Sequence, residues 1–111
     1  MMGLAGIIVL SWTPPTHNTD GSVLMDLSGF NVYMKSVDNS VFALGNNIKD
    51  SKAVSTVLYD IKEGKYHIVM TAYNMDNHES DYSIQIEVYV EDDLVVYVSI
   101  PMPPTNVVSK E

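Results

Sequence analysis

The sequence predicts an all-β protein folded as an antiparallel sandwich of two sheets. Apolar and polar residues alternate along most of the chain, whereas apolar residues at helical spacing are rare. The alternating segments are rich in Val, Ile, Thr and Tyr, which favour strands. Turn-forming residues separate these segments at intervals of roughly ten residues, which is typical of β-sandwiches. The 111 residues suffice for one such domain with a core that needs no disulfide.

Seven strands are expected along the chain. Their ranges are 6–12, 29–37, 41–44, 53–59, 65–73, 83–91 and 94–100. Pro14 and Pro15 end the first strand, because proline has no amide hydrogen to donate to a ladder. Asp20-Gly21 marks a turn in the connection that follows, and residues 45–52 are expected to form a loop.

The alternation also assigns the faces of these strands, except for strand 53–59, whose inward face stays open. The expected inward residues are Ile8, Leu10, Trp12, Phe30, Val32, Met34, Tyr66, Ile68, Met70, Ala72, Ile84, Ile86, Val88 and Val90. The structural core is predicted to centre on Trp12, Phe30, Val32, Tyr66, Ile68 and Met70. The expected outward residues of the central strand are His67, Val69, Thr71 and Tyr73.

Four short motifs add to this pattern. They are Trp12-x-Pro14-Pro15, Gly29-Phe30-x-Val32-Tyr33, Gly64-x-Tyr66 with Ala72-Tyr73, and Glu79-Ser80-x-Tyr82-Ser83. Trp12 suits an aromatic residue that bridges two sheets. Tyr66 with Ile61 suits a tyrosine corner, in which the hydroxyl donates to nearby backbone. On these motifs, residues 5–91 resemble a fibronectin type III domain, an immunoglobulin-like β-sandwich. The chain departs from that family at Asn77-His78, where members often carry Gly-Asn, and asparagine still allows the left-handed turn.

A second departure concerns the start of the domain. A fibronectin type III domain begins with a strand before the tryptophan strand, and residues 1–5 are too short to supply one. The resemblance therefore implies a shortened first strand and a vacant sheet edge, whose unpaired backbone groups need a cover. Residues 94–100 form a surplus apolar strand, and the segment after them resembles the opening of another such domain.

The sequence leaves two alternatives for the strand that covers this edge. Strand 94–100 either folds back as an extra strand of its own sandwich or pairs with another subunit by strand addition. We therefore divide the chain into a sandwich, residues 1–93, and a C-terminal strand with a Pro-rich tail, residues 94–111, packed on the domain or on a neighbouring subunit. The candidate interface residues are Tyr89, Val95, Val96, Tyr97, Val98, Ile100, Pro103 and Pro104.

Composition argues against several classes of partner. The net charge is −8 and the chain has no arginine, so we expect no nucleic acid partner. The apolar run 4–10 is shorter than a membrane span, and no Lys or Arg precedes Lys35. We therefore expect neither a membrane partner nor a secretory signal. The chain has no cysteine, which suits a reducing compartment.

The sequence carries no motif of a catalytic or cofactor site, so we expect no enzyme activity, no cofactor and no metal. The three histidines, His17, His67 and His78, are far apart in sequence. The acids that could be imagined around calcium lack the fixed spacing of a calcium loop and suit turns; they are Asp20, Asp26, Asp76, Glu79 and Asp81. The outward tyrosines suit either a protein interface or cross-strand pairs; they are Tyr33, Tyr73, Tyr89 and Tyr97.

The function expected from these features is structural. The resemblance implies a small bacteriophage virion component, a capsid decoration or a tail or fibre accessory, assembled in the host cytoplasm as an oligomer or on capsid or tail proteins. The alternative is a spacer or a carbohydrate-binding or adhesion module of a bacterial extracellular multidomain protein. Other protein subunits are the expected partners, and carbohydrate is a weaker candidate.

Overall fold

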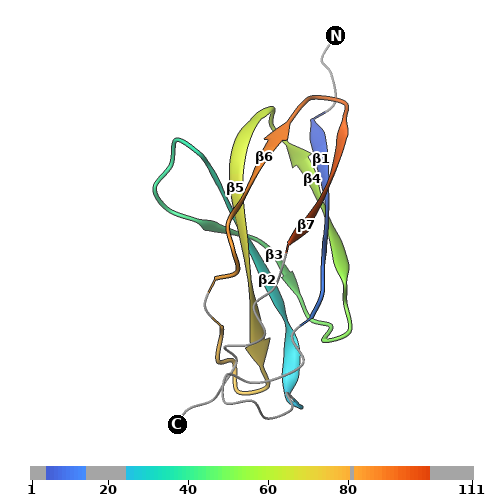
Figure 1. Ribbon diagram of the computed structural model, residues 1–111, viewed down its shortest axis with the longest axis vertical. Helices are drawn as coiled ribbons and strands as arrows, with labels where there is room; N and C mark the ends of the chain where they lie inside the picture. The colour runs from blue at the N-terminus through green and yellow to red at the C-terminus, as the bar shows by residue number, and fades with distance from the viewer. Residues whose placement is uncertain (1–4, 15–24, 81, 101–111) are drawn as a thin grey trace.

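The computed structural model describes residues 5–14, 25–80 and 82–100 (Figure 1). Within these ranges the regular structure is entirely β, and no helix is present that could cross a membrane. The strands are β1 (Gly6–Trp12), β2 (Leu27–Ser36), β3 (Ala43–Ile48), β4 (Ser55–Ile61), β5 (Gly64–Asn74), β6 (Ile86–Val90) and β7 (Val95–Ile100).

The strands form two sheets, one with the order β4-β1-β7 and one with the order β3-β2-β5-β6. Neighbouring strands are antiparallel except β1 and β7, which run parallel. Figure 1 shows β1, β4 and β7 grouped on one side of the molecule and β2, β3, β5 and β6 on the other. This arrangement confirms the predicted two-sheet sandwich and is compatible with an immunoglobulin-like or fibronectin type III fold.

The extra C-terminal strand lies within the sandwich of its own chain. β7 pairs with β1 in continuous register from Ile7 opposite Val95 to Trp12 opposite Ile100. The chain reaches this position by a turn after β6, in which Leu94 N donates to Glu91 O at 3.2 Å and Asp93 adopts a φ of 66°. β7 therefore forms one edge of the three-stranded sheet, next to β1.

The core lies between the two sheets and is built from their inward faces. Trp12 from one sheet and Phe30 from the other meet with ring centroids 5.3 Å apart. The buried members of this core are Ile8, Leu10, Trp12, Phe30, Val32, Leu58, Ile68, Met70, Ala72, Val88, Val90 and Ile100. Truncating an aromatic ring such as that of Phe30 to alanine would cost about 3–5 kcal/mol, because the surrounding residues are close-packed.

Tyr66 closes the corner between β4 and β5. Its ring is half-buried against the core, and its hydroxyl donates to the Lys62 carbonyl oxygen at 2.6 Å. This is the tyrosine-corner hydrogen bond expected from the Gly64-x-Tyr66 motif. Gly64 itself has a φ of 155°, a conformation that favours glycine.

β3 differs from the sequence prediction. The predicted strand 41–44 begins too early and ends too soon, since β3 runs from Ala43 to Ile48 and Val41 is 73% exposed in the turn before it. Residues 45–48 were expected to be loop because Gly and Asn disfavour strands. Pairing with β2, which sets Asn47 opposite Asn31 and Ile48 opposite Phe30, overrides that local preference.

β6 also differs, because the predicted strand 83–91 becomes regular only at Ile86. Ser80 and Ser83 interrupt the ladder: their hydroxyls accept hydrogen bonds from Ala72 N and Met70 N, both at 2.9 Å. These side chains replace regular backbone partners, and the segment leaves the strand conformation. Ile84, predicted to point inward, is consequently 66% exposed.

Candidate functional site

The outer face of the three-stranded sheet is apolar. Ile8 and Leu10 point into the core, so Ile7 and Val9 point outward. The register sets Val95 opposite Ile7, and both Val57 and Tyr97 opposite Val9. With Tyr59, two residues after Val57, these residues form one contiguous surface, named here the apolar face; its members are Ile7, Val9, Val57, Tyr59, Val95 and Tyr97.

Exposure distinguishes this face from the core. Tyr97 is 76% exposed, Tyr59 65% and Val95 45%, while Ile7 and Val9 on the central strand are half-buried. Serines border it at one end: Ser11 lies opposite Ser55 and Ser99. No member of the apolar face carries a charge, so water covers it at a free-energy cost.

The outer edge of β7 adjoins the apolar face, and it is named here the free edge because it pairs with no other strand among the described residues. Leu94 O accepts a hydrogen bond from Ile7 N at 3.1 Å, so the backbone groups of Leu94 point toward β1. Successive residues of a strand direct these groups to opposite sides. The N–H and C=O groups of Val95, Tyr97 and Ser99 therefore point away from β1, along the outer edge of the sheet.

Three of the four edge strands in the described sandwich carry features that discourage further pairing. β3 contains Gly45 and a register shift, and β4 contains a register shift near Asp60, which has a φ of 59°. β6 carries the charged Glu87. Charges and bulges are the devices by which natural sheets protect their edges. β7, with the sequence VVYVSI and an uninterrupted register, has none of them.

The predicted interface residues fall into separate groups. Val95 and Tyr97 lie on the apolar face, and Tyr89 is 52% exposed on β6, where the negative charge of Glu63 raises its pKa. Val96, Val98 and Ile100 instead point inward against the core of their own chain, and Ile100 is only 1% exposed. The alternation of β7 explains this split. Pro103 and Pro104 lie outside the described residues.

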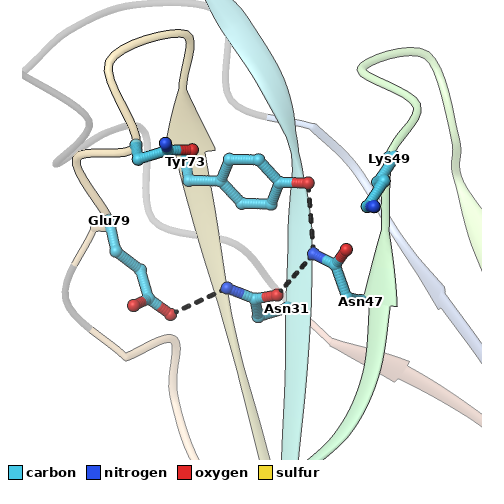
Figure 2. A pocket seen from close by; sticks show the side chains of 6 residues that line it. Asn31, Asn47, Lys49, Tyr73 and Glu79 are labelled. Carbon is cyan, nitrogen blue, oxygen red and sulfur yellow. Dashed lines mark hydrogen bonds between the residues drawn. The ribbon is translucent and has the colours of Figure 1, made fainter.

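A polar network occupies the outer face of the other sheet, centred on Glu79 (Figure 2). Glu79 Oε2 accepts hydrogen bonds from Asn31 Nδ2 at 3.1 Å, from the Tyr33 hydroxyl and from the Thr71 hydroxyl. Glu79 reaches these strands because it forms an isolated bridge with Tyr73, near the end of β5. Thr71, predicted to point outward, does so but is 1% exposed beneath this cover.

The network fixes the charge state of Glu79. Burial by itself would raise the pKa of this carboxyl, but hydrogen bonds from Thr71, Tyr33 and Asn31 outweigh it and hold the pKa below its ordinary value. Burial, followed by the hydrogen bond to Glu79, raises the pKa of Tyr33 to about 12. At neutral pH the pair is a carboxylate that accepts and a phenol that donates.

Beside this network, Tyr73 lies over Gly29. The two residues are opposite each other in the β2–β5 register, and a Cβ at Gly29 would stand 2.6 Å from the Tyr73 hydroxyl oxygen and 2.9 Å from Cζ. Asn47 Nδ2 donates to the Tyr73 hydroxyl at 3.1 Å and to Asn31 Oδ1 at 2.8 Å. These side chains line an open pocket of about 270 Å³; its lining among the described residues is Asn31, Asn47, Lys49, Tyr73, Asn77 and Glu79.

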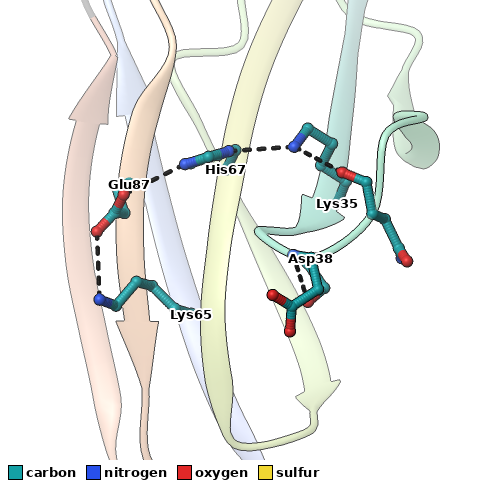
Figure 3. Close-up of polar contacts among 7 residues, drawn as sticks. Lys35, Asp38, Lys65, His67 and Glu87 are labelled. Atoms are coloured by element: carbon teal, nitrogen blue, oxygen red, sulfur yellow. Dashed lines mark hydrogen bonds and ion pairs between the residues drawn. The ribbon is translucent and has the colours of Figure 1, made fainter.

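A row of polar side chains crosses the same sheet further from the pocket (Figure 3). Lys35 Nζ lies 3.2 Å from His67 Nδ1, and His67 Nε2 lies 3.2 Å from Glu87 Oε1. Lys65 adds an ion pair with Glu87 at 3.7 Å. Lys35, His67 and Glu87 lie directly opposite one another on β2, β5 and β6. Cross-strand hydrogen bonds of this kind stabilise strand pairing by a few tenths to about 1 kcal/mol each.

The candidate metal ligands do not converge in the part of the chain that the structure describes. No group of three or more His, Asp or Glu side chains there could hold a metal ion. His67 belongs to the row with Lys35 and Glu87, and His78 lies in the turn after β5, where its N–H donates to Asn74 Oδ1 at 2.9 Å. His17, Asp20 and Asp81 lie outside the described residues.

Sequence reasoning did not single out the pocket. The sequence alone predicts a loop at Asn47 and gives no reason to select Asn31. Glu79 stands out only as a motif residue and as one of the acids that could be imagined around calcium. The sequence carries one signal: Asn31 falls on the outward face of an apolar strand, where asparagine, a poor strand former, is uncommon.

In comparisons with known proteins, no protein family model and no curated protein matches the sequence of this chain. The fold and the surfaces above define the class, a small two-sheet β-sandwich protein with one apolar and one polar outer face.

Proposed function

We propose that this chain is a non-catalytic structural protein that assembles with a second copy of itself through the free edge of β7. Around a two-fold axis, two β7 strands would pair antiparallel and join their sheets into one six-stranded sheet. The observation that supports this most directly is the edge itself, which is regular, uncharged and free of Pro, Gly and bulges. Such an edge is a ready template for another strand.

The area of the apolar face argues against a dimer held together only by stacking of two such faces. Three strands about 4.8 Å apart and five residues long, at about 3.3 Å each, cover on the order of 250 Å². A standard protein interface buries roughly 800 Å² per partner, so the apolar face alone is too small for a stable dimer. Pairing of two β7 strands adds backbone hydrogen bonds between the two copies, and these bonds fix the register of the two strands.

The same pairing would double the apolar face to on the order of 500 Å², a size at which exposed patches commonly mark binding sites. We propose that such a dimer is a component of a bacteriophage virion, as a capsid decoration or a tail or fibre accessory. The motifs around Trp12, Gly29, Tyr66 and Glu79 support a fibronectin type III relationship, on which this proposal rests.

The second candidate is a spacer or adhesion module of a bacterial extracellular multidomain protein. The polar pocket on the opposite sheet favours it, because a binding site away from β7 requires no self-assembly. The two candidates differ in solution: the module is a monomer at all concentrations, whereas the assembling subunit is a dimer.

Analytical ultracentrifugation of the full chain over a range of concentrations tests the proposal. We expect a monomer–dimer equilibrium that Tyr97→Pro shifts to monomer, because proline lacks the N–H that Tyr97 directs to the free edge. Tyr97→Ala is the matched control: it removes the same side chain but keeps the N–H, and it should still dimerise.

Thermal unfolding accompanies each variant, so that loss of the fold is not mistaken for loss of pairing. Tyr97→Pro spares the hydrogen bonds to β1 and should melt close to the parent protein, whereas Val98→Pro should melt well below it. A chain that stays monomeric at high concentration, or a Tyr97→Pro variant that dimerises like the parent, would overturn the proposal.

A further inference from the structure

We propose that the pocket on the four-stranded sheet binds one neutral sugar ring of a glycan, with the Tyr73 ring as its platform and Asn31, Asn47 and Glu79 as its hydrogen-bonding groups. The pocket lies on the sheet opposite to β7, so this inference is independent of the proposed self-assembly.

The pocket is made of residues that weaken the sheet. Gly29 lies inside β2, and Asn31 and Asn47 lie opposite each other on β2 and β3. Glycine and asparagine are among the poorest strand formers. Valine or threonine at the two asparagine positions would have the higher strand propensity, so the asparagines are present for their hydrogen-bonding groups and not for strand preference.

Gly29 is required by the position of Tyr73. A side chain at residue 29 would collide with the phenol and, at 2.1 Å, with the Ile48 carbonyl oxygen. With only hydrogen at this position, the Tyr73 ring settles close to the β2 backbone, and the Asn47 amide holds its hydroxyl at 3.1 Å (Figure 2). A ring fixed in this way presents an apolar surface to the C–H groups of a sugar at little entropic cost.

Hydrogen bonds hold the polar side chains of the pocket in place, yet two of their oxygen atoms accept no hydrogen bond from the described residues. Glu79 Oε2 accepts three hydrogen bonds, whereas Oε1 accepts none from the described residues. Asn47 uses its two N–H donations on Tyr73 and Asn31, which leaves Oδ1 without a described partner. Lys49 and Asn77 line the rim. Acceptors and donors spaced around a ring surface match the hydroxyls of a sugar, each of which both donates and accepts.

Size and charge narrow the ligand class. The pocket, about 270 Å³ and open, is below the range of roughly 300–1,000 Å³ typical of drug-sized ligands, so it suits a single polar ring. An ionised Glu79 in a protein of net charge −8 disfavours phosphorylated or acidic sugars. One carboxylate among neutral amides is too few ligands for a hard cation.

Amide NMR spectra of the full chain, recorded with the methyl glycosides of glucose, galactose, mannose and N-acetylglucosamine, test the inference. We expect at least one glycoside to shift signals of residues 29–31, 47–49 and 73–79 with millimolar affinity. Tyr73→Ala should weaken that binding at least tenfold, and Tyr73→Phe, which keeps the platform, should lose far less. Glu79→Gln should also weaken it, because an amide is a poorer acceptor for a hydroxyl than a carboxylate.

Tyr89→Ala is the matched control, since it removes a half-exposed tyrosine from the same sheet outside the pocket and should bind like the parent protein. Dispersed spectra of each variant establish that it is folded. Failure of every glycoside to shift these signals, shifts centred on another surface, or full affinity in folded Tyr73→Ala would each overturn the inference. None of these results depends on whether β7 pairs with a second copy.

Discussion

Ile100→Ala measures how much β7 contributes to the fold of its own chain. Ile100 is 1% exposed, and it stands opposite Trp12 at the end of the β1–β7 ladder. The substitution removes three carbon atoms from a buried side chain, and such changes cost roughly 2–5 kcal/mol. We expect about 3 kcal/mol, a large fraction of the 5–15 kcal/mol by which small domains are usually stable.

Urea unfolding provides the assay. With an m-value of about 2 kcal/mol/M for a domain of this size, a loss of ~3 kcal/mol lowers the midpoint by about 1.5 M. Ser99→Ala, one position earlier and exposed, is the control and should change stability by less than about 0.5 kcal/mol. The measurement is made on dilute protein. A midpoint for Ile100→Ala equal to that of the control would mean that β7 does not complete the core of an isolated chain.

Three further outcomes follow from the polar face and can be measured on the same preparations. Gly29→Ala should lower the melting temperature sharply, since its Cβ would stand 2.1 Å from the Ile48 carbonyl oxygen; unfolding at the parent temperature would contradict the close approach. Folding lowers the pKa of Glu79, so its contribution to stability is present above the unfolded pKa and is lost as pH falls through the lower, folded value. The effect is small for this exposed group, and Glu79→Gln should remove it from an acid titration of stability. Tyr33 should be the tyrosine that ionises near pH 12 in an ultraviolet titration; its contribution is present below the unfolded pKa and is lost as pH rises through about 12, and an unchanged titration curve in Tyr33→Phe would refute the assignment.

The fold could be predicted from sequence because its signals are local. Alternation placed Ile8, Leu10 and Trp12 on one face, and proline marked the end of β1, so strand existence and the sandwich followed without tertiary information. Strand boundaries failed where distant residues decide them. Asn46 and Asn47 are in a strand because β2 pairs with them, and Ile84 is outside one because serine hydroxyls take the backbone donors of β5.

The surfaces were harder to predict, for a related reason. The sequence showed that residues 94–100 are apolar on both faces, but only the register with β1 separates Val95 and Tyr97 from the inward Val96 and Val98. The pocket depends on four segments brought together by pairing: β2, β3, β5 and the turn after β5. Asn31, Asn47 and Glu79 do not follow a fixed spacing in the sequence, so no sequence motif could predict the pocket.

Val57→Lys separates the two ways in which the apolar face could be covered. Val57 lies on β4, two strands away from the free edge of β7, and is half-buried on the outer surface. If two copies pair edge to edge, residue 57 faces solvent in the dimer, and the lysine leaves the dissociation constant unchanged within about twofold. If two copies stack face to face, the lysine is buried without a partner, which costs several kcal/mol and removes the dimer. Edge pairing therefore predicts that Val57→Lys sediments like the parent protein while Tyr97→Pro does not, and the reverse pattern would assign the association to the face and not to the strand.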